Sequence, residues 1–382
     1  VAWFSLTGAI LPSAASFNIF VDPYGIWPAP RVHQWNWSKP KQNLHQRLFR
    51  AADIAYRQPT TVILGSSRVI YSLSPQHPAL SKYQPAYNSG LSSANMYEEL
   101  RYFQHALYHQ PDLKLVIIGL DFFSFNRYIK NRPDFSESRL ARPFLLSSDS
   151  LVTTLSWSVL LDSRETLKRN QATPDVQLFS RDGFGQYPEE LKETQSSGYR
   201  LKAFEHSITS HFRSPEVLGT YQISEFQLAN FQKIVDICRR QNIELRLFIS
   251  PTHVADLEAI YAAGLWPEFE NWKRRLVEIA PIWDFSGYTS INSEKISDQM
   301  LNYWDSHHYR RRVGDKILNT ILDSSQSSQS TNWPITPLTQ RNIEQRLQET
   351  REVQNSWRAQ NQSTVEWVQN LKKMHRLPSD SN

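Results

Sequence analysis

The chain has 382 residues, of which 40% are hydrophobic and 12% aromatic, so it can build a sizeable core in one large domain or in two. Its 42 basic and 37 acidic residues leave a net charge of only +5 without a long basic block, which argues against a nucleic-acid partner. The single cysteine, Cys238, excludes an intrachain disulfide, and no Cys/His spacing is typical of a zinc site, so we expect neither a metal nor another cofactor.

The first 25 residues differ from the rest of the chain. Residues 1–20 are apolar and uncharged, and a turn rich in Pro and Gly follows them. Pro12 and several serines weaken this segment as a complete membrane span. We expect residues 1–25 to be the remnant of a membrane anchor or an uncleaved signal region, and the alternative is a buried N-terminal helix.

Strands and helices are predicted to alternate over most of the chain. Apolar runs predict strands in five segments: 60–66, 85–91, 113–123, 243–251 and 281–287. Apolar side chains at helical spacing predict three helices: 94–109, 224–241 and 266–280. Continuous apolar strands that alternate with helices indicate an α/β fold with a mostly parallel sheet covered on both faces. In such a fold the strands end in loops along one edge, where functional sites lie.

The remaining segments define the expected organisation. The main domain is predicted to span residues 26–322, with an insertion at about 127–221 that contains one helix, at 151–169, and then polar loop. An insertion of this length can lie over the edge of the sheet as a lid. Residues 323–340 are rich in Ser, Gln and Pro, which is typical of a linker. Residues 341–382 are expected to form a polar helix and tail, which wraps the domain or docks on a partner.

Three short segments carry side chains suited to catalysis. Gly65–Arg68 follows the first predicted strand, Asn88–Ser93 follows the second, and Asp305–His308 lies in a late loop. A serine hydroxyl is protonated at neutral pH, so it needs a histidine within hydrogen-bond distance and an acid that orients the ring. Asp-x-x-His spacing delivers acid and imidazole from one turn, and the nucleophile then comes from another strand end.

This pattern resembles the SGNH, or GDSL-type, hydrolase superfamily over about residues 60–322. In that family the serine is third in a Gly-x-Ser block, and the acid and base form an Asp-x-x-His near the C-terminus. The resemblance implies a three-layer α/β/α sandwich and selects Ser67 as nucleophile, His308 as base and Asp305 as acid. The Gly-Ser-Ser form resembles the membrane-anchored, cell-envelope branch, as in D-alanyl-lipoteichoic-acid esterases and polysaccharide O-acetylation proteins.

The resemblance also implies donors for an oxyanion, and here the match is weaker. The backbone N–H of Ser67 is one expected donor, and the family's second-block glycine falls on Ser93, whose N–H can still donate. The third-block asparagine is replaced by Asp121, and an ionised aspartate repels a developing oxyanion. Three explanations remain open: Asp121 is protonated or turned away, Asn126 substitutes for it, or catalysis is weak. Weak catalysis is one of them because loss of one oxyanion donor lowers the rate by about 10²–10³.

Other residues near these segments are candidates for a functional role, and an ordinary structural role is the alternative. Four of them are candidates for substrate binding: Arg68, Asn88, Gly90 and His253. Arg68 either binds an anionic group or packs at the surface, and His253 either lines the cleft or begins a helix. His307 is expected to be exposed. The aromatic side chains beside the acid and base either pack in the core or form a sugar platform: Tyr303, Trp304 and Tyr309.

The expected function is ester hydrolysis or O-acyl transfer through an acyl-serine intermediate. The resemblance implies an O-acylated envelope or secreted polysaccharide as substrate, a membrane acyltransferase as candidate partner, membrane association through the N-terminus, and an extracytoplasmic or periplasmic location. The alternative is a non-catalytic envelope protein that binds glycan or a membrane acyltransferase, which Asp121 and the C-terminal helix favour. A hydrolase that acts on lipid is a third hypothesis.

Overall fold

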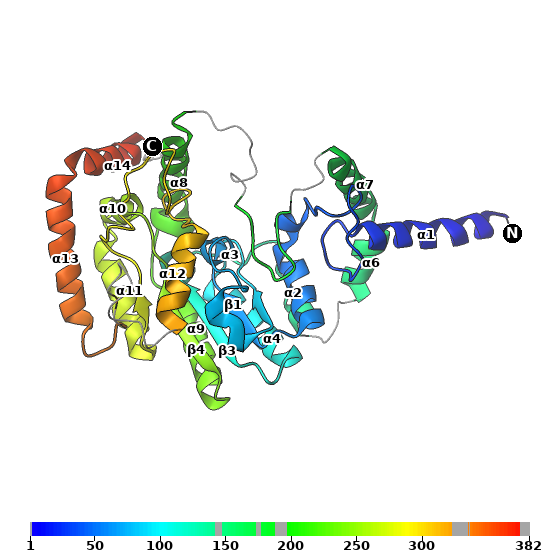
Figure 1. Cartoon of the computed structure of the whole chain (residues 1–382), viewed down its shortest axis with the longest axis horizontal. Coiled ribbons are helices and arrows are strands. Elements are labelled where there is room, and N and C mark those ends of the chain that lie inside the picture. The colour runs from blue at the N-terminus through cyan, green and yellow to red at the C-terminus, as the bar shows by residue number, and fades with distance from the viewer. Residues whose placement is uncertain are drawn as a thin grey trace, which may run out of the picture.

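The computed structural model describes residues 2–141, 147–172, 177–187, 197–322, 335 and 337–374. At the centre of the main body lies a five-stranded sheet in the order β2-β1-β3-β4-β5 (Figure 1). All neighbouring strands are parallel. The strand bounds are β1 Thr61–Leu64, β2 Ala86–Asn88, β3 Leu115–Leu120, β4 Glu244–Ile249 and β5 Trp283–Asp284.

The strands form where the sequence predicts them, because their residues are apolar on both faces. Every residue of β1 and β3 is buried, as expected for a sheet with helices on either side. The register aligns Leu64 with Ile118, and Leu120 with Ile249, so neighbouring strands end at one edge. The α/β class with a parallel sheet is therefore confirmed, and the arrangement is compatible with a three-layer α/β/α fold.

The helices of the main body begin at recognisable caps. Asn95 accepts the N–H of Glu98 before α4, and Ser224 accepts the N–H of Gln227 before α9. Helices α4 and α9 pack on each other, and they contact β1 and β4 respectively. The helix bounds are α2 Gln46–Arg57, α3 Ser67–Ile70, α4 Met96–His109, α9 Glu225–Arg240, α10 Val254–Ala262, α11 Trp266–Ile279 and α12 Arg311–Leu322. Cys238, on α9, is buried in the core.

The insertion contains more helix than the sequence predicts. The single helix expected at 151–169 is two, because the chain breaks at Ser156, whose hydroxyl accepts the N–H of Val159 at 3.2 Å. A further helix, α8, occupies a stretch for which the sequence predicts polar loop. The bounds are α5 Glu137–Leu140, α6 Ser147–Leu155, α7 Trp157–Ala172 and α8 Tyr199–Arg213. Helices α6 and α7 pack on α1 (Ala2–Val21) in a lobe beside the main body (Figure 1).

The C-terminal region also forms two helices where one was expected. They are α13 Ile343–Gln360 and α14 Gln362–Met374, which meet at Asn361. Helix α13 packs against α11, and α14 packs against α8 and α10 with Val365, Val368 and Leu371 buried. Most of the predicted linker, 323–340, lies outside the described residues. Its described part contacts the domain, because Leu338 pairs with Ile282 beside the sheet.

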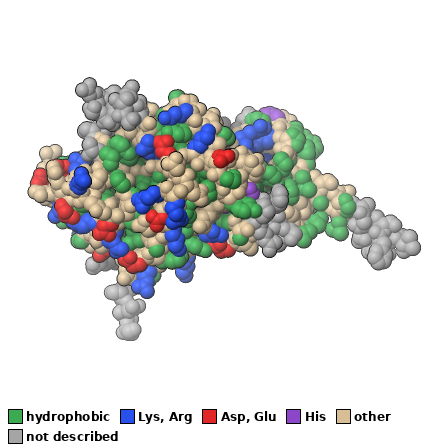
Figure 2. Space-filling view, turned by 90° about the horizontal axis from the view of Figure 1, so that it is seen from below, with side chains coloured by type: hydrophobic (Ala, Val, Ile, Leu, Met, Phe, Trp, Pro, Cys, Tyr) green, Lys and Arg blue, Asp and Glu red, His purple; other side chains and the backbone are tan. Residues whose placement is uncertain are grey.

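The surface carries both charged and large hydrophobic side chains. On the face seen in Figure 2, positive and negative side chains are interspersed over the body. Large exposed hydrophobic side chains occur on the lobe helices α6 and α7, including Leu151, Val152, Leu155 and Trp157. Among the described helices, none combines the length and the apolar character needed to cross a membrane.

Candidate active site

Ser67 lies at the point where β1 turns sharply into α3. Gly65 has φ +135°, and a Cβ there would lie 2.9 Å from the carbonyl oxygen of Gly119, so only glycine fits this turn. The next residue, Ser66, caps α3 by accepting the N–H of Arg68 at 3.2 Å. The local sequence thus places Ser67 as the first residue of a short helix at the edge of the sheet where the strands end.

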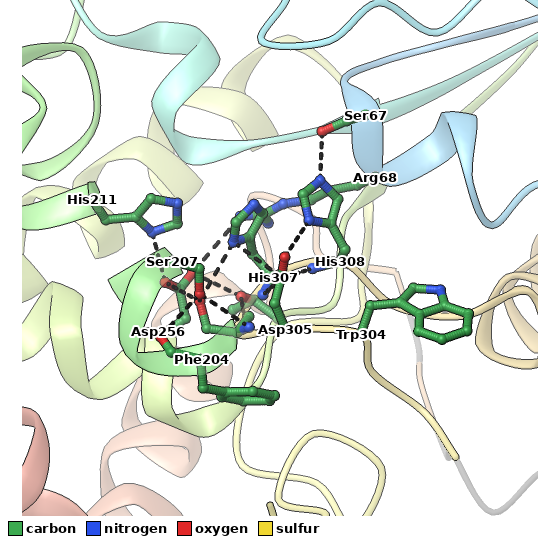
Figure 3. A network of polar contacts seen from close by, with 12 residues as sticks. Ser67, Arg68, Phe204, Ser207, His211, Asp256, Trp304, Asp305, His307 and His308 are labelled. Carbon is green, nitrogen blue, oxygen red and sulfur yellow. Dashed lines mark hydrogen bonds and ion pairs between the residues drawn. The ribbon is translucent and has the colours of Figure 1, made fainter. Parts of the chain in front are cut away.

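The late Asp-x-x-His turn delivers the acid and the base to this edge. Oδ1 of Asp305 accepts the backbone N–H groups of His307 at 2.9 Å and His308 at 2.8 Å, which fixes the turn. Oδ2 of Asp305 lies 2.7 Å from Nδ1 of His308, and Nε2 of His308 lies 2.8 Å from Oγ of Ser67 (Figure 3). Residues 241 positions apart in the sequence are therefore in hydrogen-bond contact, in the order serine, imidazole, carboxylate.

A tyrosine from the insertion completes this arrangement, and the sequence interpretation missed it. The hydroxyl of Tyr187 donates a hydrogen bond to Oδ2 of Asp305 at 2.8 Å. Its ring stacks on Trp304, with centroids 5.2 Å apart. Tyr187 therefore restrains the carboxylate oxygen that faces His308, whereas the two backbone N–H groups hold the other oxygen. The aromatic residues around the turn are buried in the core and do not form an open sugar platform: Tyr303, Trp304 and Tyr309.

Burial and neighbouring charges fix the protonation of the turn. Burial alone raises the pKa of Asp305, but the hydrogen bonds that it accepts from the ring of His308 and from the backbone N–H of His307 lower it, so the pKa lies well below its ordinary value and the group is a carboxylate. Burial lowers the pKa of His307 well below its ordinary value, so that ring is neutral. His307 is therefore largely enclosed, and the expectation of an exposed side chain is wrong.

The two charged residues near the expected oxyanion position, Arg68 and Asp121, contact each other. Nη1 of Arg68 lies 3.2 Å from Oδ1 of Asp121, and both side chains are buried. Asp121 thus forms an ion pair beneath the nucleophile and offers no hydrogen-bond donor to an oxyanion. Asn126 does not line the pocket of Ser67, and its amide donates to the carbonyl of Pro215 at 3.0 Å. Ser93, with φ +53°, lines the same small pocket as Ser67.

Asn88 and Gly90 lie beneath the site and do not line that pocket. The amide of Asn88 donates to the carbonyls of Val69 at 2.8 Å and Leu73 at 2.9 Å, and its oxygen accepts the N–H of Gly90. A Cβ on Gly90 would lie 2.7 Å from Val69, so the backbone needs glycine here. Both residues hold α3 and its serine in position, which is a structural role.

His253 begins helix α10, and both nitrogens of its ring are occupied. Nδ1 accepts the N–H of Ala255 at 3.1 Å, and Nε2 donates to the carbonyl of Glu294 at 2.7 Å. The ring is buried against Phe204 and Tyr303. This hydrogen bonding fits only the neutral ring, and burial lowers the pKa of His253 to about 4. Of its two interpretations, the structure supports the helix start.

Stability should therefore fall in acid because of His253. Its pKa is lower in the folded chain than in the unfolded one, so the stabilisation is complete above about pH 6.5 and is lost as pH falls towards 4, by about 3 kcal/mol. Urea unfolding at a series of pH values should show a flatter profile for His253→Asn, which keeps a capping oxygen. The exposed His206→Asn should behave like the wild type. Identical pH profiles for wild type and His253→Asn would contradict this account.

The pocket above the nucleophile holds about 70 Å³ and has a polar wall. Nη2 of Arg132 and Oε2 of Glu216, both from the insertion, lie 3.0 Å apart in an ion pair at this wall. Two histidines also face the pocket, His307 from the turn and His211 from α8. The insertion therefore supplies part of the lining of the pocket.

Two groups of described side chains bring potential metal-ligand atoms within 4.8 Å of one another: His211, Asp256 and His307, and Asp305, His307 and His308. The carboxylate of Asp256 already faces a cation, because Nη2 of Arg68 lies 3.8 Å from it. Asp305 is engaged by Tyr187, by His308 and by two backbone N–H groups. Either group would have to give up such contacts to close around an ion.

No protein-family model and no curated protein matches this sequence. The function must therefore be argued from the arrangement of the side chains themselves.

Proposed function

We propose that the protein is a serine-dependent ester hydrolase or O-acyltransferase. The observation that carries this proposal is the contact of Ser67 with His308 at 2.8 Å and of His308 with Asp305 at 2.7 Å. A base hydrogen-bonded to a serine, and oriented in turn by a carboxylate, is the arrangement that activates a hydroxyl for attack on an acyl carbon.

The proposed reaction has two steps. Oγ of Ser67 attacks the ester carbonyl while Nε2 of His308 takes its proton, and the carboxylate of Asp305 stabilises the imidazolium that forms. The backbone N–H groups of Ser67 and Ser93 are the proposed oxyanion donors. His308 then returns the proton to the leaving alcohol. In the second step, attack of water on the acyl-serine gives hydrolysis, and attack of a second hydroxyl gives acyl transfer.

The proposed substrate is an O-acylated envelope or secreted polysaccharide. This part of the proposal rests on the resemblance of the sequence blocks to the SGNH cell-envelope branch, and with it come the expected periplasmic or other extracytoplasmic location and a membrane acyltransferase as partner. The polar wall of the pocket, with the pair of Arg132 and Glu216, supports a hydroxyl-rich ligand.

The alternative function is glycan or acyltransferase binding without catalysis. Asp121 favours it, because the side-chain donor that the resemblance implies for the oxyanion is absent at this position. Covalent labelling separates the two functions. A serine-directed phosphonate should modify wild-type protein once per chain, at Ser67 by peptide mapping. No labelling and no turnover of p-nitrophenyl acetate would support the binding role.

We propose that the lobe of α1, α6 and α7 associates with a membrane surface. Helix α1 carries no charged residue, and Trp157 and Leu151 expose 71% and 57% of their area on the neighbouring helices. Exposed Trp and Leu beside an uncharged helix are typical of a segment that lies at the lipid interface. Wild-type protein should sediment with phospholipid vesicles, and the double variant Leu151→Ser/Trp157→Ser should do so several-fold less. Equal sedimentation of the two would contradict this placement.

A further inference from the structure

A second histidine–carboxylate pair lies near the first and has no part in the proposed attack. Nδ1 of His211, on α8, lies 2.8 Å from Oδ1 of Asp256, on α10 (Figure 3). The other oxygen of Asp256 accepts the hydroxyl hydrogen bond of Thr252 at 2.9 Å. Asp256 is buried, so the ring of His211 is oriented by a fixed carboxylate, as the ring of His308 is by Asp305.

The two pairs are joined by the neutral ring of His307. Its centroid lies 4.5 Å from that of His211 and 4.1 Å from that of His308. Figure 3 shows the three imidazoles in a row, with His211 at the end away from Ser67 and His308. Since Ser67, His307 and His211 all line the small pocket, the second pair faces the space that an acylated serine and its attacking group must share.

The protonation state of Asp256 decides which nitrogen of His211 carries the proton. Burial raises the pKa of Asp256, but the hydrogen bond from His211 and the charge of Arg68 act against it, so the pKa lies below its ordinary range and the group is a carboxylate. A carboxylate only accepts hydrogen bonds, so Nδ1 of His211 carries the proton and donates it. In the neutral ring Nε2 then has a free lone pair, and among the described residues it has no hydrogen-bond partner.

The charges of the pocket wall argue against an anionic ligand. Arg68 faces two carboxylates, Asp121 and Asp256, and Arg132 is balanced by Glu216. An anionic group would therefore meet no unbalanced cation among these residues. The groups that remain for a ligand are the acceptor nitrogen of His211 and the polar side-chain atoms of Arg132 and Glu216. Both kinds of group suit hydroxyl groups.

We infer that the His211–Asp256 pair binds a hydroxyl of the acyl acceptor, and that the acceptor is a neutral polyol such as a sugar. This inference rests on the proposed function. The hydroxyl that His211 holds is a neighbour of the one that reacts. The reacting oxygen bonds to the acyl carbon as the bond from that carbon to Oγ of Ser67 breaks. The proton of the reacting hydroxyl passes to Nε2 of His308 and then to Oγ of Ser67.

The partition of the acyl-enzyme between glycerol and water tests the inference. With p-nitrophenyl acetate as donor and glycerol as probe, wild-type protein should form acetylglycerol as well as acetate. His211→Phe, which keeps a ring but offers no acceptor, should lower the ratio of acetylglycerol to acetate at least tenfold. Labelling of Ser67 by the phosphonate should change less than twofold, because acylation does not use His211. His211→Gln keeps an acceptor oxygen and should recover part of the ratio.

The controls separate this inference from the proposed function on which it rests. His206→Phe, an exposed histidine on the same helix, should leave the ratio unchanged. An unchanged ratio in His211→Phe would overturn the inference, as would a wild-type protein that is labelled but forms no acetylglycerol. Parallel loss of labelling and transfer in both His211 variants would assign His211 to structural support and would also overturn it. Absence of labelling in the wild type would instead reject the proposed function.

Discussion

Replacement of Ser67 by alanine should lower the turnover of p-nitrophenyl acetate by about 10⁴–10⁶ and should abolish phosphonate labelling. The effect is this large because alanine removes the only atom that forms the acyl bond, and the imidazole of His308 then has nothing to activate. The fold should survive, since within the described part of the chain the Ser67 hydroxyl bonds to the ring of His308 and to no backbone group. Steady-state kinetics and a thermal melt of the variant measure both expectations.

The matched control is Ser92→Ala, a partly exposed serine in the loop after β2, which should keep wild-type turnover. Turnover that persists in Ser67→Ala would show that another group is the nucleophile. Loss of turnover in both variants would indicate that the loops at the site are disturbed, and would not identify Ser67 as the nucleophile. A wild type without turnover or labelling would leave glycan or partner binding as the better hypothesis.

The sequence predicts much of the framework of this site, because local patterns determine it. Continuous apolar runs predict the strands, and parallel strands bring their ends to one edge. Gly65 marks the sharp turn, and the Asp-x-x-His spacing marks a turn in which one carboxylate holds its own histidine. The approach of Ser67 to His308 was inferred from these signals and from the family resemblance, not from any local pattern that links the two segments.

The missed residues are those that tertiary packing alone brings to the site. Tyr187 and His211 come from the insertion and Asp256 from α10, and each finds its partner 45 or more positions away. Only α8 had a usable local signal, since Phe204 and Ile208 recur one helical turn apart and are both buried. A sequence periodicity places a residue on a face of a helix, but it does not say which distant residue that face meets.

Asp121 stands where the family resemblance implies asparagine, and its contact with Arg68 explains how the fold tolerates it. An aspartate at this buried position would be costly alone, but Arg68 lies 3.2 Å away and supplies the opposite charge. The arginine after the serine and the aspartate after β3 are therefore one compensated pair. This pair offsets part of the charge repulsion expected at the oxyanion, although it leaves the backbone donors of Ser67 and Ser93 without help from a side chain.

Asp305→Asn should lower turnover by about 10⁴ while the fold is kept. Asparagine can still accept the two backbone N–H groups of the turn, so the loop should hold its shape. Its NH₂ group, however, would donate to Nδ1 of His308 and force the proton onto Nε2, the nitrogen that must accept the proton of Ser67. Phosphonate labelling should slow in parallel with turnover, because both reactions need the same base.

The comparison that isolates this effect is Asp236→Asn on α9, which neutralises a carboxylate outside the site and should leave turnover unchanged. Unfolding by urea should show whether the Asp305 variant is folded under the assay conditions. A folded Asp305→Asn protein with turnover within tenfold of the wild type would mean that the ring of His308 is oriented by other contacts. Tyr187 is the remaining candidate, because its hydroxyl lies 3.5 Å from the same nitrogen of His308.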